Sequence, residues 1–104
     1  MFCMTVLYGH PKDPAEFDRY YNDVHTPLVQ KVKGLKKVTV TRFSPGMRGE
    51  QSKYYLMAQL YANSQEEFNQ IMSTPEGRAT GADTRNFATG GVEFLLGNEQ
   101  EISL

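Results

Sequence analysis

The sequence has one cysteine, no tryptophan and no long apolar run. Cys3 cannot form a disulfide within the chain, which fits a reducing compartment. No apolar segment approaches the roughly 18 residues that a membrane-spanning helix requires. The first ten residues lack the basic start and small-residue cleavage site of a signal peptide. We therefore expect a cytoplasmic protein without membrane contact.

An excess of charge of one sign is also missing. Lysine and arginine total 11 and aspartate and glutamate total 12, so the net charge is −1. A nucleic-acid-binding surface needs a basic face to neutralise phosphates, so no nucleic-acid partner is expected. The 104 residues suit a single globular domain. We place that domain at residues 1–97 and a C-terminal tail at 98–104.

Turn residues and hydrophobic periodicity divide the chain into six elements. The predicted strands are residues 2–8, 35–43, 53–62 and 92–96. A helix begins at Asp13-Pro14, which suits a cap followed by a first helical residue, and ends at Gly34. A second helical region spans 64–88 and breaks or restarts at Pro75. The order βαββαβ predicts an α+β, ferredoxin-like fold, a four-stranded antiparallel sheet with its helices on one face.

The third strand carries large side chains on both of its faces. One face has Tyr54, Leu56, Ala58 and Leu60, and the other has Tyr55, Met57, Gln59 and Tyr61. Helices on one side cannot cover both faces of the sheet. An apolar face left in water would forgo several kcal/mol of burial free energy, at roughly 25 cal/mol per Å² of apolar area. We expect a homodimer that packs these open faces together. The alternative is a monomer with a half-exposed aromatic sheet.

Common catalytic and metal motifs are absent from the sequence. It has no phosphate-binding loop, no Cys-x-x-Cys and no nucleophile elbow. Two histidines and one cysteine make a structural zinc site an unfavourable interpretation. We therefore predict no metal and no cofactor.

The run YYNDVHTPL, residues 20–28, is the most informative stretch. Pro27 cannot donate to the carbonyl of Asp23, so the helix either kinks or stops and restarts with Thr26 as its cap. Either irregularity lies next to His25, one helical turn after Tyr21. A half-buried histidine near a cavity could transfer a proton near pH 7, although a purely structural histidine fits the same pattern. No second acid–base group is evident, and Asp83 is interpreted as an exposed partner of Arg85 or as a cap.

Two longer runs resemble a known family. The run FDRYYNDVHTPLV at residues 17–29, followed by KGLKKV at 33–38, is similar to the His-x-Pro-Leu and Pro-Gly-Leu pattern of the EthD-like family. Lys33 stands where that family often has proline. Residues 73–88 and 90–96 resemble the family's second helical region and last strand. The resemblance implies a dimeric α/β barrel, in which two ferredoxin-like protomers pack sheet to sheet.

The resemblance also implies a function and places the family's recurrent histidine at His25. We expect a cofactor-independent oxidoreductase, monooxygenase-like or acid–base enzyme that acts on a small hydrophobic or aromatic metabolite. The alternative is a non-catalytic accessory or stress-associated dimer that binds such a molecule, and haem binding through His25 is a third option. The candidate catalytic residues are His25 and Tyr21. The candidate substrate-binding residues are Tyr8, Tyr20, Pro27, Leu28 and Phe87.

Overall fold

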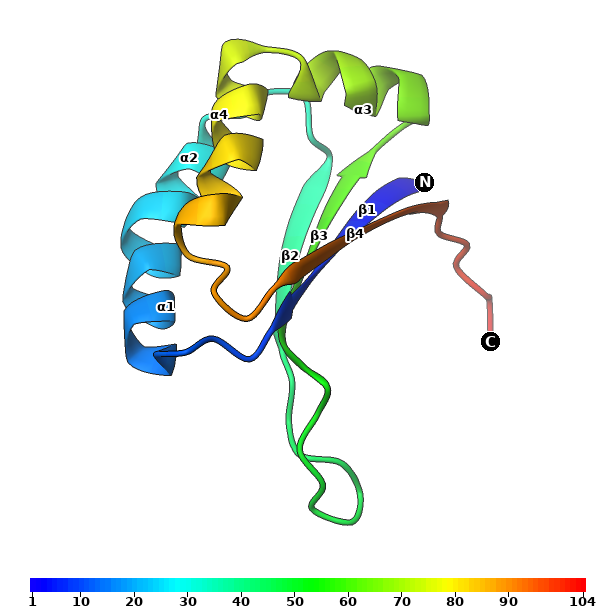
Figure 1. Cartoon of the computed structure of the whole chain (residues 1–104). Coiled ribbons are helices and arrows are strands. Elements are labelled where there is room, and N and C mark those ends of the chain that lie inside the picture. The colour runs from blue at the N-terminus through cyan, green and yellow to red at the C-terminus, as the bar shows by residue number, and fades with distance from the viewer.

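The computed structural model describes all residues, 1–104, and confirms the predicted order of elements (Figure 1). Two short irregular turns, a π turn at Tyr21–His25 and a 3₁₀ turn at Thr84–Asn86, extend α1 and α4. The strands are β1 (Phe2–Gly9), β2 (Lys37–Arg42), β3 (Tyr54–Ala62) and β4 (Val92–Asn98). The helices are α1 (Pro14–Tyr20), α2 (Thr26–Gln30), α3 (Gln65–Met72) and α4 (Pro75–Asp83).

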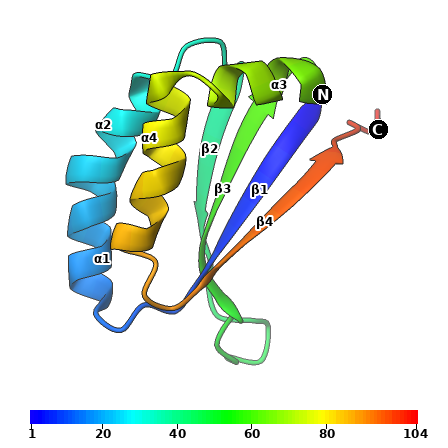
Figure 2. The ribbon, with the colours of Figure 1, turned by 45° about the horizontal axis from the view of Figure 1, so that its top comes forward.

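The strands form one antiparallel sheet in the order β2-β3-β1-β4. Helices α1, α2 and α4 cover one face of this sheet, and α3 crosses near one end of it (Figure 2). The fold is therefore the predicted ferredoxin-like α+β arrangement. The sheet of one chain is open, with β2 and β4 at its edges, and does not close into a barrel.

The core lies between the sheet and the helices. Alternate residues of a strand point to the same face, so Phe2, Val6 and Tyr8 of β1 face the helices together with Leu56, Ala58 and Leu60 of β3. The helical layer contributes a matching set of buried side chains: Phe17, Tyr21, Val32, Phe68, Ile71 and Phe87. Burial of this set against the central strands is the main force that holds the two layers together.

Side-chain caps determine where the helices begin. The carboxylate of Asp13 accepts a hydrogen bond from the Glu16 amide at 3.2 Å, and Thr74 accepts one from the Gly77 amide at 3.1 Å. Pro75 therefore starts α4 rather than interrupting a longer helix. Gly77 allows the corner between α3 and α4, because a Cβ there would overlap the backbone of Ile71 and Met72. No helix is long and apolar enough to span a membrane.

The sheet face away from the helices is less apolar than the sequence predicts. The register between β1 and β3 shifts between Tyr8 and Gly9, and this irregularity turns Tyr55 toward α1. There the Tyr55 ring packs edge-on against Phe17, and its hydroxyl donates to Asp18 at 3.0 Å. The placement of Tyr55 on the open face was therefore wrong.

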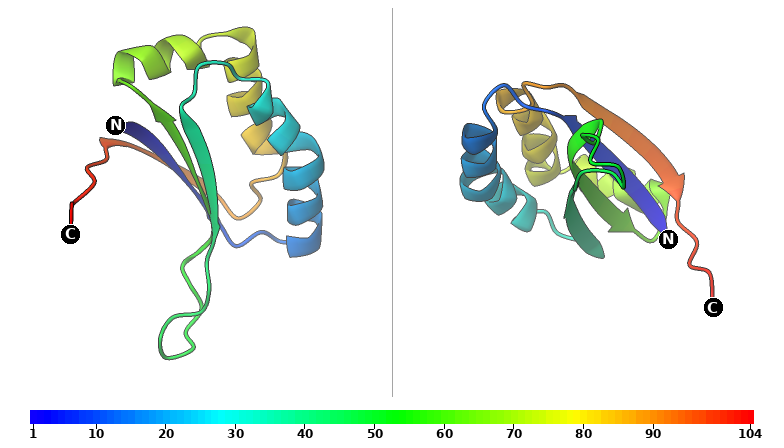
Figure 3. Two further views of the ribbon diagram at one scale, coloured as in Figure 1. Left: turned by 180° about the vertical axis from the view of Figure 1, so that it is seen from behind. Right: turned by 90° about the horizontal axis from the view of Figure 1, so that it is seen from below.

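The remaining residues of that open face are mixed in character. Leu7, Met57 and Leu95 are apolar, but Thr5, Thr39 and Gln59 lie among them. Gln59 donates to Thr5 at 3.3 Å, so part of this face is already hydrogen-bonded within one chain. Figure 3 shows that no element covers the face and that the hairpin of residues 43–53 extends beyond the end of the sheet.

The tight centre of the core predicts a large loss of stability on truncation. Leu56 is fully buried, at 0% exposure, whereas Leu104 is fully exposed. We expect Leu56→Ala to lower the free energy of unfolding by about 2–5 kcal/mol, because it removes apolar contacts and leaves a cavity. Urea denaturation followed by circular dichroism measures this, with Leu104→Ala as the matched control. Equal, small effects of the two substitutions would contradict the described core.

Candidate functional site

A π turn connects α1 to α2 and carries the central histidine. The amide of Thr26 donates to the carbonyl of Tyr21, five residues earlier, and the Thr26 hydroxyl donates to the same carbonyl at 2.9 Å. Pro27 follows in the first turn of α2, where its missing amide is tolerated. The predicted irregularity is confirmed, but it is a π turn in a continuous helix. Thr26 is not a cap for a restarted helix.

The π turn places His25 in the helix–sheet interface. Its side chain is buried, with the whole residue only 4% exposed. The ring packs against Tyr21, with ring centroids 5.2 Å apart, and against Phe87 at 4.7 Å. These two rings leave the imidazole little freedom to rotate, so its two nitrogens point in defined directions.

His25 forms a buried pair with Asp83 at the end of α4. The Nδ1 atom of His25 lies 2.9 Å from Oδ2 of Asp83. The other carboxylate oxygen of Asp83 accepts hydrogen bonds from the Tyr20 hydroxyl at 2.6 Å and from the side-chain amide of Asn86 at 3.0 Å. Asp83 is therefore neither exposed nor paired with Arg85, so the first interpretation of this residue was wrong. Asp83 does stand at the N-cap position of the 3₁₀ turn Thr84–Asn86, but its side chain makes no capping hydrogen bond there.

The surroundings of Asp83 favour its ionised form. Burial alone would raise the pKa of this carboxyl, but the hydrogen bonds from Tyr20, Asn86 and His25 outweigh that effect and lower the pKa below its ordinary value. An ionised carboxylate can only accept hydrogen bonds, so Nδ1 of His25 carries the proton that it donates. In the neutral ring, Nε2 then has the free electron pair and can act as a base.

A cavity lies between the helices and the sheet, and His25 lines it. The cavity has a volume of about 40 Å³ and is partly open to solvent. Most of the lining is apolar and comes from both layers. The apolar lining includes Met4, Val6, Val29, Val38, Leu60, Met72 and Phe94. Phe94 of β4 lies at the rim and is 51% exposed, so we place the mouth of the cavity near this edge of the sheet.

The polar lining consists of neutral groups. Tyr8, Tyr21, Thr80 and Thr84 contribute hydroxyls, and no lysine or arginine lines the cavity. Burial raises the pKa of Tyr21 to about 12, and it raises that of Tyr8 further above the usual range. Both hydroxyls therefore stay protonated at neutral pH. They can donate hydrogen bonds to a bound molecule but cannot act as bases there.

Two polar atoms of the cavity-lining residues have no hydrogen-bond partner within the chain. Nε2 of His25 and the Tyr21 hydroxyl form no hydrogen bond within the chain, and the Tyr8 hydroxyl has Thr84 as its neighbour. No side-chain nitrogen or oxygen that is closed off from solvent lacks a partner. These atoms are therefore not closed off from solvent, and their residues line the cavity, where a bound molecule could pair with them.

Comparisons with known proteins agree with this fold. The family model of the EthD domain matches residues 10–91. The chain belongs to the EthD family. It is 38% identical to an uncharacterized 11.0 kDa protein of Rhodococcus erythropolis, from the thcB-thcC intergenic region, over 98% of each chain. It is also 38% identical to an EthD family protein of Bacillus halodurans, whose crystal structure matches with a TM-score of 0.89 over 96% of this chain and 99% of that one.

Other solved structures share the fold at low identity. An EthD-like protein of Ralstonia eutropha is 20% identical, with a TM-score of 0.71 over 92% of this chain and 88% of that one. A cofactor-independent oxygenase of Streptomyces nogalater (14%, TM-score 0.65, 97% and 93%) and a hydroxynitrile lyase of Passiflora edulis (10%, TM-score 0.73, 99% and 97%) are more distant. At these identities the likeness shows the fold alone.

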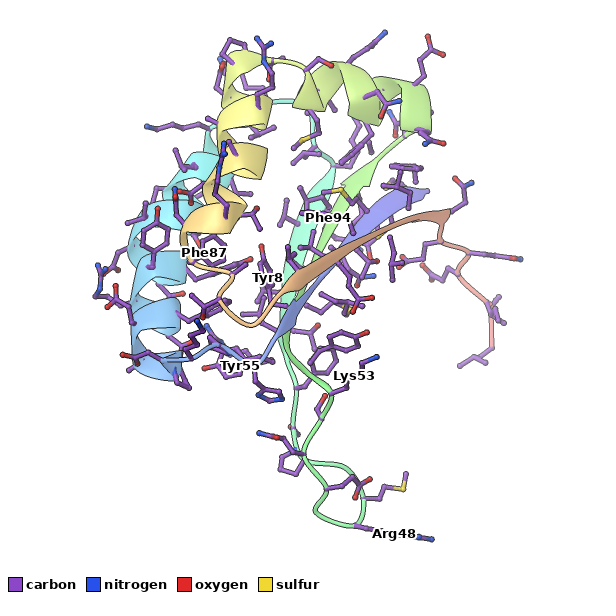
Figure 4. All side chains as sticks on the ribbon, viewed as in Figure 1. Tyr8, Arg48, Lys53, Tyr55, Phe87 and Phe94 are labelled. Atoms are coloured by element: carbon purple, nitrogen blue, oxygen red, sulfur yellow. The ribbon has the colours of Figure 1, made fainter.

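The structure of this EthD-family chain brings together only some of the predicted site residues. His25, Tyr21 and Tyr8 line the cavity. Phe87 does not line the cavity, but its ring packs against that of His25 and against that of Tyr8, beside which Figure 4 shows it. The remaining three predicted residues lie elsewhere.

Tyr20, Pro27 and Leu28 do not line the cavity. The Tyr20 hydroxyl donates a hydrogen bond to the Asp83 oxygen that does not contact His25, and Tyr20 also lines a surface groove. Pro27 is exposed, and Leu28 lies beside Pro75 and Ala79 of α4. The helix turns these two side chains away from the sheet, although they follow His25 closely in the sequence.

Sequence reasoning missed Asp83, Thr84 and Phe94. Asp83 lies 58 residues from His25 in the sequence, and no local pattern connects them. A signal was nevertheless present, because an acidic residue at the C-terminal end of α4 is unfavourable for the helix dipole and needs another partner. No three side chains of the types His, Cys, Asp and Glu lie close enough to hold a metal ion.

The buried carboxylate predicts a specific dependence of stability on pH. The folded-state pKa of Asp83 is lowered, so its contribution is complete above about pH 4 and is lost as the pH falls through the folded-state pKa. We expect Asp83→Asn to lower the free energy of unfolding at pH 7 by about 1–3 kcal/mol and to flatten its decline below about pH 4.

Urea denaturation at a series of pH values measures both effects. Asp23→Asn is the matched control, because Asp23 is an exposed carboxylate in the π turn that also carries His25. If the curves of the Asp83→Asn variant and the unmodified chain ran parallel below pH 4, the ionised state assigned to Asp83 would be wrong.

Proposed function

We propose that this EthD-family chain is an acid–base enzyme that needs no bound cofactor. Its base is Nε2 of His25, which takes a proton from a small, largely apolar molecule in the cavity. The observation that carries this proposal is the orientation of one imidazole. Asp83 holds its Nδ1 atom at 2.9 Å, which leaves Nε2 free in an apolar cavity. A base aimed and desolvated in this way has the features of a general acid–base catalyst.

Asp83 is a positioning residue in this proposal. It fixes the tautomer of His25 and stabilises the imidazolium that forms when Nε2 accepts a proton. Tyr20 and Asn86 hold the carboxylate in place from the other side. The alternative of a non-catalytic binding protein was motivated by the lack of a second acid–base group. Asp83 gives His25 a charged partner but does not itself donate or accept the substrate proton, so the non-catalytic binding protein stays the alternative.

Oxidative and non-oxidative outcomes share the same first step. Once His25 has taken the proton, the electron-rich substrate either regains a proton at another atom or reacts with molecular oxygen. Two distant proteins of this fold are a cofactor-independent oxygenase and a hydroxynitrile lyase. Their names support the view that this fold accommodates either outcome. An oxidoreductase of the monooxygenase type remains a prediction for this chain.

The proposed assembly is a homodimer through the open sheet face, in which two copies of the chain form one dimeric α/β barrel. Leu7, Met57 and Leu95 would form the apolar contacts between the two sheets. A protein of Bacteroides fragilis with the ferredoxin-like fold is dimeric, at 11% identity and a TM-score of 0.66 over 94% of this chain and 95% of that one. A cytoplasmic location stays part of the proposal.

A base in an apolar cavity can be tested without the natural substrate. The probe 5-nitrobenzisoxazole is a neutral aromatic molecule that opens to a coloured nitrophenolate when a base removes its C–H proton. We expect the chain to accelerate this opening above free imidazole, and His25→Ala to lower the rate by a factor of about 10²–10⁴. Absorbance of the nitrophenolate measures the rate.

His10→Ala is the matched control. His10 lies outside the cavity, and its Nε2 atom contacts the carbonyl of Ser52 at 2.6 Å. Circular dichroism establishes that both variants are folded. Equal rates for the His25→Ala variant and the unmodified chain would refute His25 as the base.

If the open sheet faces form the dimer interface, a charged residue introduced there should halve the molar mass of the particle in solution. We expect light scattering to give twice the 11.8 kDa chain mass. Met57→Glu should give a single-chain mass, because it would bury an unpaired carboxylate between the sheets. Met47→Glu, in the exposed hairpin, is the control and should stay dimeric. A single-chain mass for the unmodified protein at micromolar concentration would overturn the dimer.

A further inference from the structure

Two hydroxyl-bearing residues, Tyr8 and Thr84, line the cavity from opposite sides. Tyr8 rises from the central strand β1, and Thr84 comes from the turn after α4, so the two approach from opposite layers. Both are more than nine-tenths buried. The Tyr8 hydroxyl is close to that of Thr84, and the negative charge of Asp83 contributes to its raised pKa. This pair of hydroxyls therefore lies near the His25–Asp83 pair.

The charge of the cavity restricts what can bind at this pair. No lysine or arginine lines the space, and Asp83 places a negative charge behind His25. A carboxylate or phosphate would lose its hydration without gaining a cationic partner, which is costly in an apolar site. A neutral oxygen can instead accept a hydrogen bond from a tyrosine that stays protonated.

We propose that the substrate is a neutral ketone, or a related carbonyl compound, with a C–H bond next to the carbonyl. Its oxygen accepts from Tyr8 and Thr84, and Nε2 of His25 removes the neighbouring C–H proton. This proposal rests on the proposed role of His25 as a base. It adds the chemical class of the substrate and a site for its oxygen.

The step balances without an oxidant or a reductant. The C–H bond breaks and its proton moves to Nε2 of His25. The electron pair of that bond forms a carbon–carbon double bond, and the carbonyl π pair moves onto oxygen, which gives an enolate. The two hydroxyls donate to this oxygen, where the negative charge develops. Return of the proton to carbon regenerates a ketone, either the original one or an isomer.

The cost of the step explains why both parts of the site are needed. A simple ketone is a much weaker acid than an imidazolium, so the base alone leaves an unfavourable enolate in an apolar cavity. Donors that stay neutral stabilise that oxygen without attracting anions in the ground state. The raised pKa values of Tyr8 and Tyr21 are consistent with this use.

Hydrogen–deuterium exchange of 2-tetralone in D₂O tests the proposal. NMR follows loss of the signals from the protons next to the carbonyl of this neutral ketone. We expect exchange faster than with free imidazole at equal concentration, and its loss in His25→Ala. Tyr8→Phe and Thr84→Val should each slow the exchange by at least about tenfold at saturating ketone. Phenylpyruvate, an enolisable ketone that carries a carboxylate, should show no exchange above background.

Matched variants separate a lost donor from a general disturbance. Tyr54→Phe and Thr41→Val remove the same hydroxyls at positions outside the cavity and should exchange 2-tetralone at the unmodified rate. Thermal unfolding shows whether each variant is folded. Thr84→Val keeps the test valid if Tyr8→Phe does not fold, because valine has nearly the shape of threonine.

The outcomes distinguish this proposal from the one it rests on. Opening of 5-nitrobenzisoxazole that depends on His25, without exchange of 2-tetralone, would overturn the ketone proposal and leave the acid–base function in place. Exchange that is unaffected by Tyr8→Phe and Thr84→Val would overturn the oxygen site. Equal exchange of phenylpyruvate would overturn the preference for neutral substrates. Absence of both reactions would overturn the acid–base function itself.

Discussion

The carboxylate of Asp83 is the group on which the helical layer and the cavity both depend. It receives hydrogen bonds from Tyr20 of α1, His25 of the π turn and Asn86 of the 3₁₀ turn, so it joins three segments of the chain. A buried charge costs several kcal/mol of lost hydration unless such partners replace the water. Three donors do so here and keep the carboxylate ionised. The interaction that fixes the helices is therefore the same one that orients the imidazole.

The order of elements follows from local chemistry that the sequence displays directly. Caps at Asp13 and Thr74, turn residues and strand alternation act over a few residues, so the fold and the irregularity near Pro27 were predictable. The pairing of His25 with Asp83 was not, because it depends on how α4 packs beside α2. Periodicity alone also placed Tyr55 on the wrong face, since a single shift of register at Gly9 reverses the side on which it points.

The open sheet face supports a second copy less strongly than alternation indicated. Tyr61 is already buried there, with its hydroxyl donating to Glu99 at 2.7 Å and the Lys37 ammonium 4.5 Å from the centre of its ring. A partner sheet would gain contacts with Leu7, Met57 and Leu95, but it would also have to accommodate Gln59 and Thr5. Such an interface would combine hydrophobic contact with polar pairing across the sheets, which makes its specificity depend on register.

The site occupies only one part of the helix–sheet interface. Phe2 packs on Phe68 near α3, with ring centroids 5.3 Å apart, and this end has no role in the proposed chemistry. The cavity instead lies under α4, where Phe94 at the edge strand leaves the interface partly open. The side chains that line a cavity lack dispersion contacts on that side. In a chain of this size, the rest of the core must therefore supply the stability. Because the rings of Tyr21 and Phe87 clamp His25 from two sides, the cavity can be open without leaving its base free to move.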